Sequence, residues 1–195
     1  MHLTLSALGT TTGRGVRVAV IITIMVLELR APEGSEWEAL RPLLATFLTY
    51  ILSFVFIGIY WNNHHHMLHA TDRITGGVLW ANLHLLFWLS LVPFTTAWVG
   101  EHHDAPAPTA AYGIVLLMCG VAYTILARRI VAVPGANERL AMALGEDRKG
   151  LASLLLYGVA VGLAFVNQWF SDAIYVAVAL MWLVPDRRIE RTDRA

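Results

Sequence analysis

The residues best suited to chemistry in this sequence are its histidines, and four of the eight lie within six positions. His64, His65, His66 and His69 follow the letters YWNN. Such a cluster is typical of a metal site, a haem ligand set or a proton relay. On a helix, consecutive side chains point about 100° apart, so the first three histidines cannot converge on one ion. A zinc ion would also need further ligands, and Asp72 is the only carboxylate nearby. We therefore expect no metal site and favour a hydrogen-bonding role for one or two of these histidines.

The remaining candidates for metal or haem chemistry are weaker. His102 and His103 stand between Glu101 and Asp104 in a polar stretch, which is typical of a solvated loop. His84 is the only histidine inside an apolar segment. A b-type haem held between helices needs a second axial ligand at the same depth. The sequence offers no second histidine there, so it predicts no cofactor.

A third pattern concerns a single hydroxyl group in an apolar stretch. The segment VAVIITIMVLEL is rich in β-branched residues and contains one hydroxyl, that of Thr23. Val20, Thr23 and Leu27 stand at i, i+3 and i+7, so they share one face of a helix. Such a face could line a narrow cation pore, where hydroxyl groups replace part of the ion's water. A helix that simply faces lipid would carry a similar apolar stripe, and the spacing alone leaves both interpretations open.

The elements that carry these residues are membrane helices. The chain has 195 residues, of which 57% are hydrophobic and 14% charged, and its mean hydropathy is +0.59. The apolar residues fall in runs near the length that crosses about 30 Å of hydrocarbon as a helix. A net charge of zero argues against a nucleic-acid partner. The single cysteine, Cys119, excludes an internal disulfide and a cysteine-based zinc site.

We predict an all-α membrane protein with one domain, residues 1–195, and six transmembrane helices. The predicted spans are residues 16–29, 40–61, 74–99, 110–126, 151–169 and 171–184. Twelve of the 14 Lys and Arg residues fall on the side that holds both termini. Because Lys and Arg gather on the cytoplasmic side of a membrane, we expect both termini to be cytoplasmic. The histidine cluster then lies at the cytoplasmic end of the second span.

Four of the predicted spans carry distinctive motifs. The first span ends IITIMVLEL, and the second ends YWNNHH. The third reads LWANLHLLFWLSLVPFTT, and the sixth ends MWLVPDRRIE. Together these motifs cover most of the chain, and in sequence and order they resemble those of bacterial members of the transmembrane protein 175 family, relatives of the endolysosomal potassium channel.

The resemblance implies a homotetramer in a bacterial plasma membrane, with the first helix of each subunit lining a central pathway. It implies passive, weakly selective flow of potassium and other monovalent cations, and no enzymatic activity. Carried over by position, Val20 matches an apolar constriction, Thr23 a hydroxyl ring associated with ion selection, and Leu27 a further apolar ring. Ile24 is assigned to the same pore lining. The alternative function is a non-conducting membrane protein whose histidine cluster binds metal or haem.

The resemblance also implies a brace between helices, and it reveals one departure. Trp61, His64, His65 and Asn82 match positions that form a structural hydrogen-bond network in the family. The family's first helix normally begins with the pattern RxxxFSD, but residues 13–15 here are Gly, Arg and Gly. We therefore expect the brace to lack its usual partner on the first helix.

Overall fold

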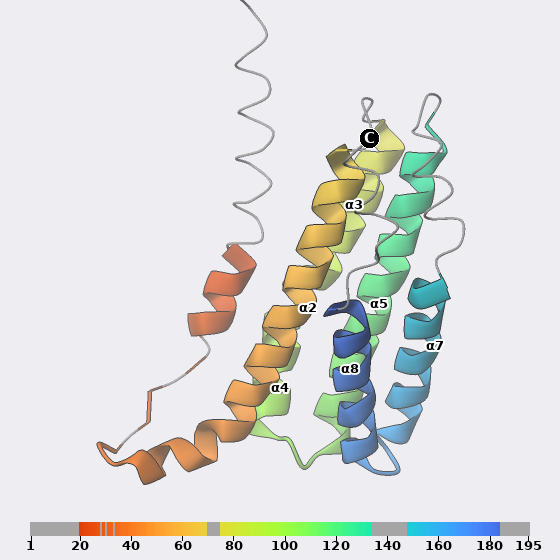
Figure 1. Cartoon of the computed structure of the whole chain (residues 1–195). Coiled ribbons are helices and arrows are strands. Elements are labelled where there is room, and N and C mark those ends of the chain that lie inside the picture. Colours follow the sequence, from red (N-terminus) through yellow and green to blue (C-terminus); the bar gives the residue numbers. More distant parts are fainter. Residues whose placement is uncertain are drawn as a thin grey trace, which may run out of the picture.

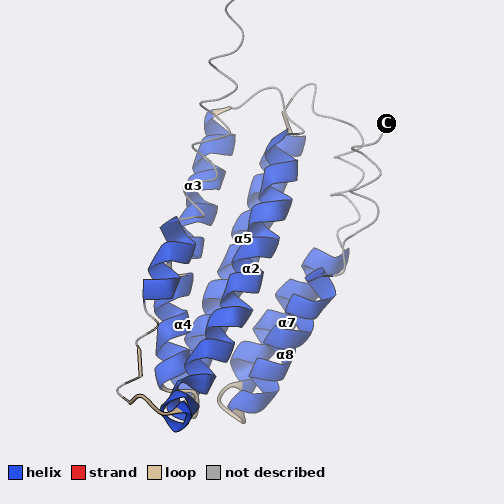
Figure 2. Ribbon diagram, turned by 60° about the vertical axis from the view of Figure 1, so that its left-hand side comes forward, coloured by secondary structure: helices blue, strands red, loops and turns tan. Residues whose placement is uncertain are grey.

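The protein is a bundle of α-helices that run up and down beside one another (Figures 1 and 2). The computed structural model describes residues 20–27, 29, 31–32, 34–69, 75–133 and 148–183. Residues 20–27 are helical. The elements that follow are η1 (Trp37–Leu43), α2 (Leu44–His69), α3 (Gly76–Ser90), α4 (Val92–Glu101), α5 (Pro106–Val131), α7 (Arg148–Leu163) and α8 (Gln168–Leu183). The predicted all-α fold is confirmed.

Three stretches of the described chain are long and apolar enough to cross a membrane: Leu44–His64, Gly76–Glu101 and Pro106–Val131. They correspond to the second, third and fourth predicted spans. Two shorter apolar helices, Lys149–Leu163 and Gln168–Leu183, correspond to the fifth and sixth. The number of six spans stays a prediction, because the first predicted span is described as helix only over residues 20–27.

The last helical hairpin turns earlier than the predicted spans placed it. The fifth span was predicted to continue to residue 169, but α7 ends at Leu163 and the chain turns over residues 164–167. Asn167 explains where α8 begins. Its side-chain oxygen accepts a hydrogen bond from the backbone N–H of Trp169 at 3.0 Å, as an N-cap residue does.

A threonine and a proline determine the helix boundaries around α3 and α4. The Thr75 hydroxyl caps α3 by accepting a hydrogen bond from the Val78 N–H at 3.4 Å. Pro93 stands at the beginning of α4 and has no N–H to offer the carbonyl of Leu89. The helix is therefore interrupted at Leu91, between α3 and α4, although the two helices together form one apolar stretch.

Helix α5 lies at the centre of the bundle and packs against α3, α4, α7 and α8. Helix α2 packs against α4 and α8, and α7 packs against α8. The buried side of α5 carries Leu116, Cys119, Ala122, Leu126 and Ile130, all without exposed surface. Small residues among large ones let neighbouring helices approach closely, which is how helices associate where lipid removes the hydrophobic driving force.

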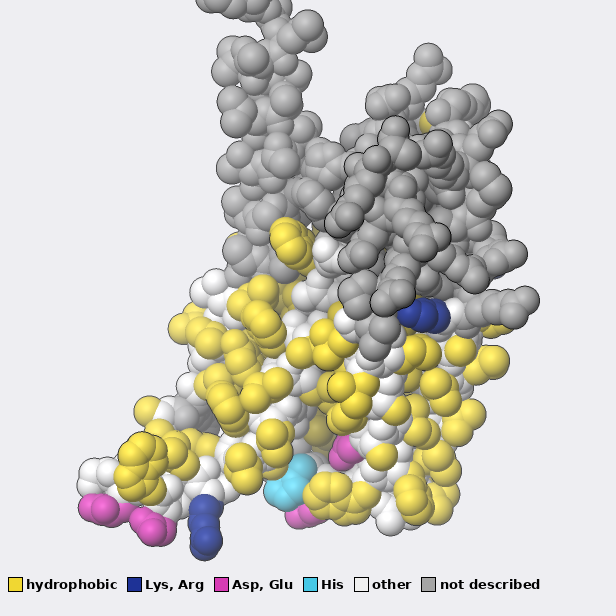
Figure 3. Space-filling view, viewed as in Figure 1, with side chains coloured by type: hydrophobic (Ala, Val, Ile, Leu, Met, Phe, Trp, Pro, Cys, Tyr) yellow, Lys and Arg dark blue, Asp and Glu magenta, His cyan; other side chains and the backbone are white. Residues whose placement is uncertain are grey.

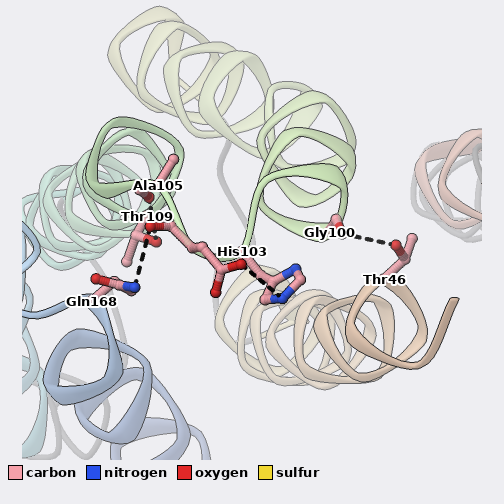
Figure 4. Close-up of polar contacts among 7 residues, drawn as sticks. Thr46, Gly100, His103, Ala105, Thr109 and Gln168 are labelled. Carbon is pink, nitrogen blue, oxygen red and sulfur yellow. Dashed lines mark hydrogen bonds and ion pairs between the residues drawn. The ribbon is translucent and has the colours of Figure 1, made fainter. Parts of the chain in front are cut away.

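Two glycines mark the closest helix contacts. A side chain at Gly100 of α4 would meet the backbone of Thr46 in α2, and the Thr46 hydroxyl donates a 2.9 Å hydrogen bond to the Gly100 carbonyl (Figure 4). A side chain at Gly113 of α5 would overlap the Tyr175 hydroxyl of α8. Both contacts depend on the absence of a Cβ atom.

Candidate functional site

The four predicted pore residues share one exposed face of the helical segment 20–27. Val20 is 50% exposed and Leu27 is 75% exposed, and Thr23 and Ile24 between them are also exposed. Their spacing, i, i+3, i+4 and i+7, covers a stripe about 100° wide on a helix. The structure therefore brings all four together on a surface that its own subunit does not cover.

The opposite face of the same helix is anchored in the bundle. Ile21 and Met25 stand four residues apart, and Met25 is only 2% exposed. Both belong to a hydrophobic cluster that also contains Ile57 of α2, Leu85 of α3 and Cys119 of α5. Burial of these side chains fixes the rotation of the helix about its axis. That rotation directs the Val20–Thr23–Ile24–Leu27 face away from the subunit.

Thr23 is the only residue with a polar side chain among residues 20–27. In an apolar pore lining, its hydroxyl is the one group of this helical segment that can offer an ion an oxygen in place of water. Val20 and Leu27, one turn away on either side, offer only hydrocarbon. A cation moving along this face would therefore meet apolar, polar and apolar surface in turn.

Two of the four predicted brace residues meet between α2 and α3. His64 Nε2 lies 2.7 Å from Asn82 Oδ1, and both side chains are half-buried. A hydrogen bond of this length requires the proton on Nε2, because the amide oxygen can only accept. Trp61, one turn earlier on α2, is exposed. The side chain of His65 lies outside the described residues, and so does the departure at residues 13–15.

His84 and His103 occupy environments separate from that of His64. His84 accepts a 2.9 Å hydrogen bond at Nε2 from the indole N–H of Trp88, on the same helix. His103 forms an exposed pair with the adjacent Asp104 at 3.5 Å (Figure 4). The pair follows α4, whose last residues contact the beginning of α2, so it lies at the opposite end of the bundle from His64, which is near the end of α2. Among the described residues, no group of three His, Cys, Asp or Glu side chains is placed to hold a metal ion. The side chains of His65, His66 and His69 lie outside the described residues.

A small cavity lies between α2, α5, α7 and α8, away from the predicted pore residues. It has a volume of about 40 Å³ and is lined by aromatic side chains, among them Tyr60, Tyr123 and Trp182, and by the polar side chains of Asn63 and Ser153. A water molecule needs roughly 10–15 Å³ of such volume, so the cavity can hold a few waters. None of the four predicted pore residues, all of which the structure describes, lines it.

Sequence reasoning missed a buried hydroxyl network that joins three helices. Thr96 of α4 donates a 2.7 Å hydrogen bond to Ser53 of α2, and Ser53 lies 2.9 Å from the hydroxyl of Tyr112 in α5. All three residues are buried. Paired hydroxyls avoid the penalty of leaving polar groups unsatisfied in an apolar core. Small polar residues inside apolar runs were the available signal, but it does not reveal the partners.

Sequence comparison relates this chain to known potassium channels. Residues 15–93 match the family described as the endosomal/lysosomal potassium channel TMEM175. A potassium channel of Chryseobacterium sp. (strain P1-3) is 49% identical over 175 residues, covering 90% of this chain and 91% of the relative. A potassium channel of Streptomyces collinus (strain DSM 40733 / Tue 365) is 28% identical over 183 residues, covering 84% of this chain and 85% of that relative.

A solved structure shares the fold. The crystal structure of a homologue of the lysosomal potassium-selective channel TMEM175 from Chamaesiphon minutus superposes with a TM-score of 0.76 at 22% identity, covering 89% of this chain and 94% of that one. The expected resemblance is thus confirmed by sequence over nearly the whole chain and by the fold. The chain belongs to the TMEM175 family of potassium channels.

Proposed function

We propose that the protein is a potassium-permeable, weakly selective channel for monovalent cations that works as a homotetramer in a bacterial plasma membrane. The observation that carries the proposal is the exposed face of residues 20–27, because one subunit leaves Val20, Thr23, Ile24 and Leu27 uncovered. Four such faces around a common axis would enclose a path lined by one hydroxyl ring between apolar rings. Relatives named as potassium channels support potassium as the permeant ion.

The proposed mechanism is passive flow and needs no bond-making group. Rings of Val20 and Leu27 side chains would narrow the path, and a narrow apolar constriction stops flow when water leaves it. The Thr23 ring would supply oxygen atoms where an ion sheds part of its hydration shell. Selectivity would be weak because one hydroxyl ring replaces only a part of that shell. We place both termini in the cytoplasm, because most Lys and Arg residues lie on their side of the predicted spans.

The decisive experiment replaces the hydroxyl of the proposed selective ring. Purified protein is reconstituted in liposomes, and potassium and sodium fluxes are measured for the wild type, Thr23→Ala and Thr23→Ser. We expect Thr23→Ala to change the ratio of the two fluxes and Thr23→Ser, which keeps a hydroxyl, to stay closer to the wild type. A conducting Thr23→Ala protein with an unaltered flux ratio would show that this helix does not line the selective part of the path.

The same preparation tests the alternative function. A haem would give an absorption band in the visible range, and a bound metal would be detected by elemental analysis of the purified protein. Flux without either signal supports the channel. A stoichiometric metal or haem in a protein that conducts no cation supports a non-conducting role for the histidine cluster.

A further inference from the structure

The short helix η1 is placed where the bundle ends. It joins the chain that leaves residues 20–27 to the beginning of α2, and it lies at the end of the bundle that carries the α4–α5 and α7–α8 connections (Figures 1 and 2). Trp98, in the last turns of α4, and Trp169, at the beginning of α8, are exposed at the same end. Exposed tryptophans at the ends of apolar helices are typical of the boundary between lipid and water.

The side chains of η1 are divided between apolar and charged. Trp37 is 84% exposed and Leu40 is 45% exposed. In a 3₁₀-helix residues three apart lie above one another, so these two share a side. Glu36, Glu38 and Arg41 are charged and also exposed. Figure 3 shows charged side chains along the outer edge of this corner, with hydrophobic side chains between them and the rest of the molecule.

Exposed apolar side chains continue from η1 into the first turns of α2. Leu44, Phe47 and Leu48 begin α2 and are all exposed. They belong to the stretch Leu44–His64, which is apolar enough to span a bilayer. A lipid environment that surrounds α2 therefore reaches the level of Leu40 and Trp37 without interruption.

We propose that η1 is an interfacial anchor that lies in the lipid leaflet at this end of the bundle. Trp37 and Leu40 enter the boundary between headgroups and acyl chains, while Glu36, Glu38 and Arg41 remain in water. An indole ring is suited to that boundary because its body is apolar and its N–H can bond to water or a headgroup. The charges include both signs, so binding needs no anionic lipid. The anchor sets the depth of the chain that connects residues 20–27 to α2.

Quenching of tryptophan fluorescence tests the anchor in the full-length protein. The contribution of Trp37 is the difference between wild-type protein and Trp37→Phe in phosphatidylcholine liposomes. We expect that contribution to lose most of its intensity when the lipid carries bromine near the headgroup, and to resist iodide in the water. Trp169→Phe, at the same end of the bundle, gives the matched difference for an indole at the end of a membrane helix.

Two outcomes would overturn the proposal. Quenching of the Trp37 contribution by iodide and not by brominated lipid would place the side chain in water. Resistance to both quenchers would place it in a protein contact, such as an interface with a second copy of the chain.

A second measurement does not depend on replacing Trp37. Leu40→Cys and Ser35→Cys each receive a spin label; Cys119 is buried and can remain. We expect the label at residue 40 to collide mainly with oxygen, which dissolves in lipid, and the label at residue 35 mainly with a water-soluble nickel chelate. Equal access of the chelate to both labels would contradict an anchor.

Discussion

At the scale of single residues, the helix 20–27 offers a matched pair of valines. Val20 belongs to the proposed pore face, whereas Val26 is similarly exposed but lies outside that face. We predict that Val20→Ala raises the resting cation flux into liposomes, because a wider and less apolar constriction keeps its water more easily. Val26→Ala removes the same two methyl groups and should leave the flux close to the wild type. An equal effect of both changes would indicate a general loosening of the helix.

The pair formed by His64 and Asn82 allows a test of the brace between α2 and α3. Removing one partner leaves the other without its hydrogen bond in a half-buried site, which costs about 1–3 kcal/mol. We predict that His64→Ala and Asn82→Ala each lower the thermal stability of the detergent-solubilised protein while the ratio of potassium to sodium flux is kept. The double variant should lose less stability than the two single losses added together. Full additivity, or an altered flux ratio at unchanged stability, would contradict a structural role.

At this scale the sequence predicted residues that share a face of one helix, but not contacts between residues on different helices. The shared face of Val20, Thr23 and Leu27 follows from helical spacing alone, and the structure places these three residues together with Ile24. The network of Thr96, Ser53 and Tyr112 joins three helices, so it depends on the rotation and depth of each helix. Those quantities are determined by packing across the whole core and cannot be obtained from spacing along one segment.

At the scale of elements, the close contact between α5 and α8 requires a glycine at position 113. A methyl group at Gly113 would displace Tyr175, whose hydroxyl donates a 3.1 Å hydrogen bond to the Thr109 carbonyl. We predict that Gly113→Ala lowers stability by roughly 1–3 kcal/mol, as overpacking of a core does. Thermal unfolding in detergent measures the effect.

The control for this change is Gly158→Ala in α7. A methyl group there would meet no atom within 4 Å, and alanine is favoured over glycine in a helix by about 1 kcal/mol. Gly158→Ala should therefore be neutral or stabilising. If both variants lose the same stability, the effect comes from the helix backbone and not from the contact with Tyr175.

Helix boundaries show where sequence signals compete. The apolar run continues past Leu163, so hydropathy alone extends α7 to residue 169, yet the Asn167 cap starts α8 within that run. The break at Leu91 is similar, because Pro93 ends a hydrogen-bond ladder inside a stretch that hydropathy treats as continuous. Caps and prolines act on the backbone, and in these two places they override the apolar pattern.

At the scale of the whole molecule, the outward face of residues 20–27 leads to a prediction of the mass of the assembled particle. If this face is enclosed by copies of itself, the purified particle contains four chains of 21.6 kDa each, or about 86 kDa without detergent. Native mass spectrometry measures that mass after detergent is removed. A particle of one chain that still conducts would contradict a pathway shared between subunits.

The two faces of residues 20–27 also bear on how such a protein can evolve. The side chains that hold the helix in the bundle, Ile21 and Met25, are not the ones proposed to meet ions. A lineage can therefore alter residues 20, 23, 24 and 27 without disturbing the contacts that fold the subunit. If these residues line the pathway as proposed, a few substitutions would change ion preference while the architecture that presents them is inherited intact.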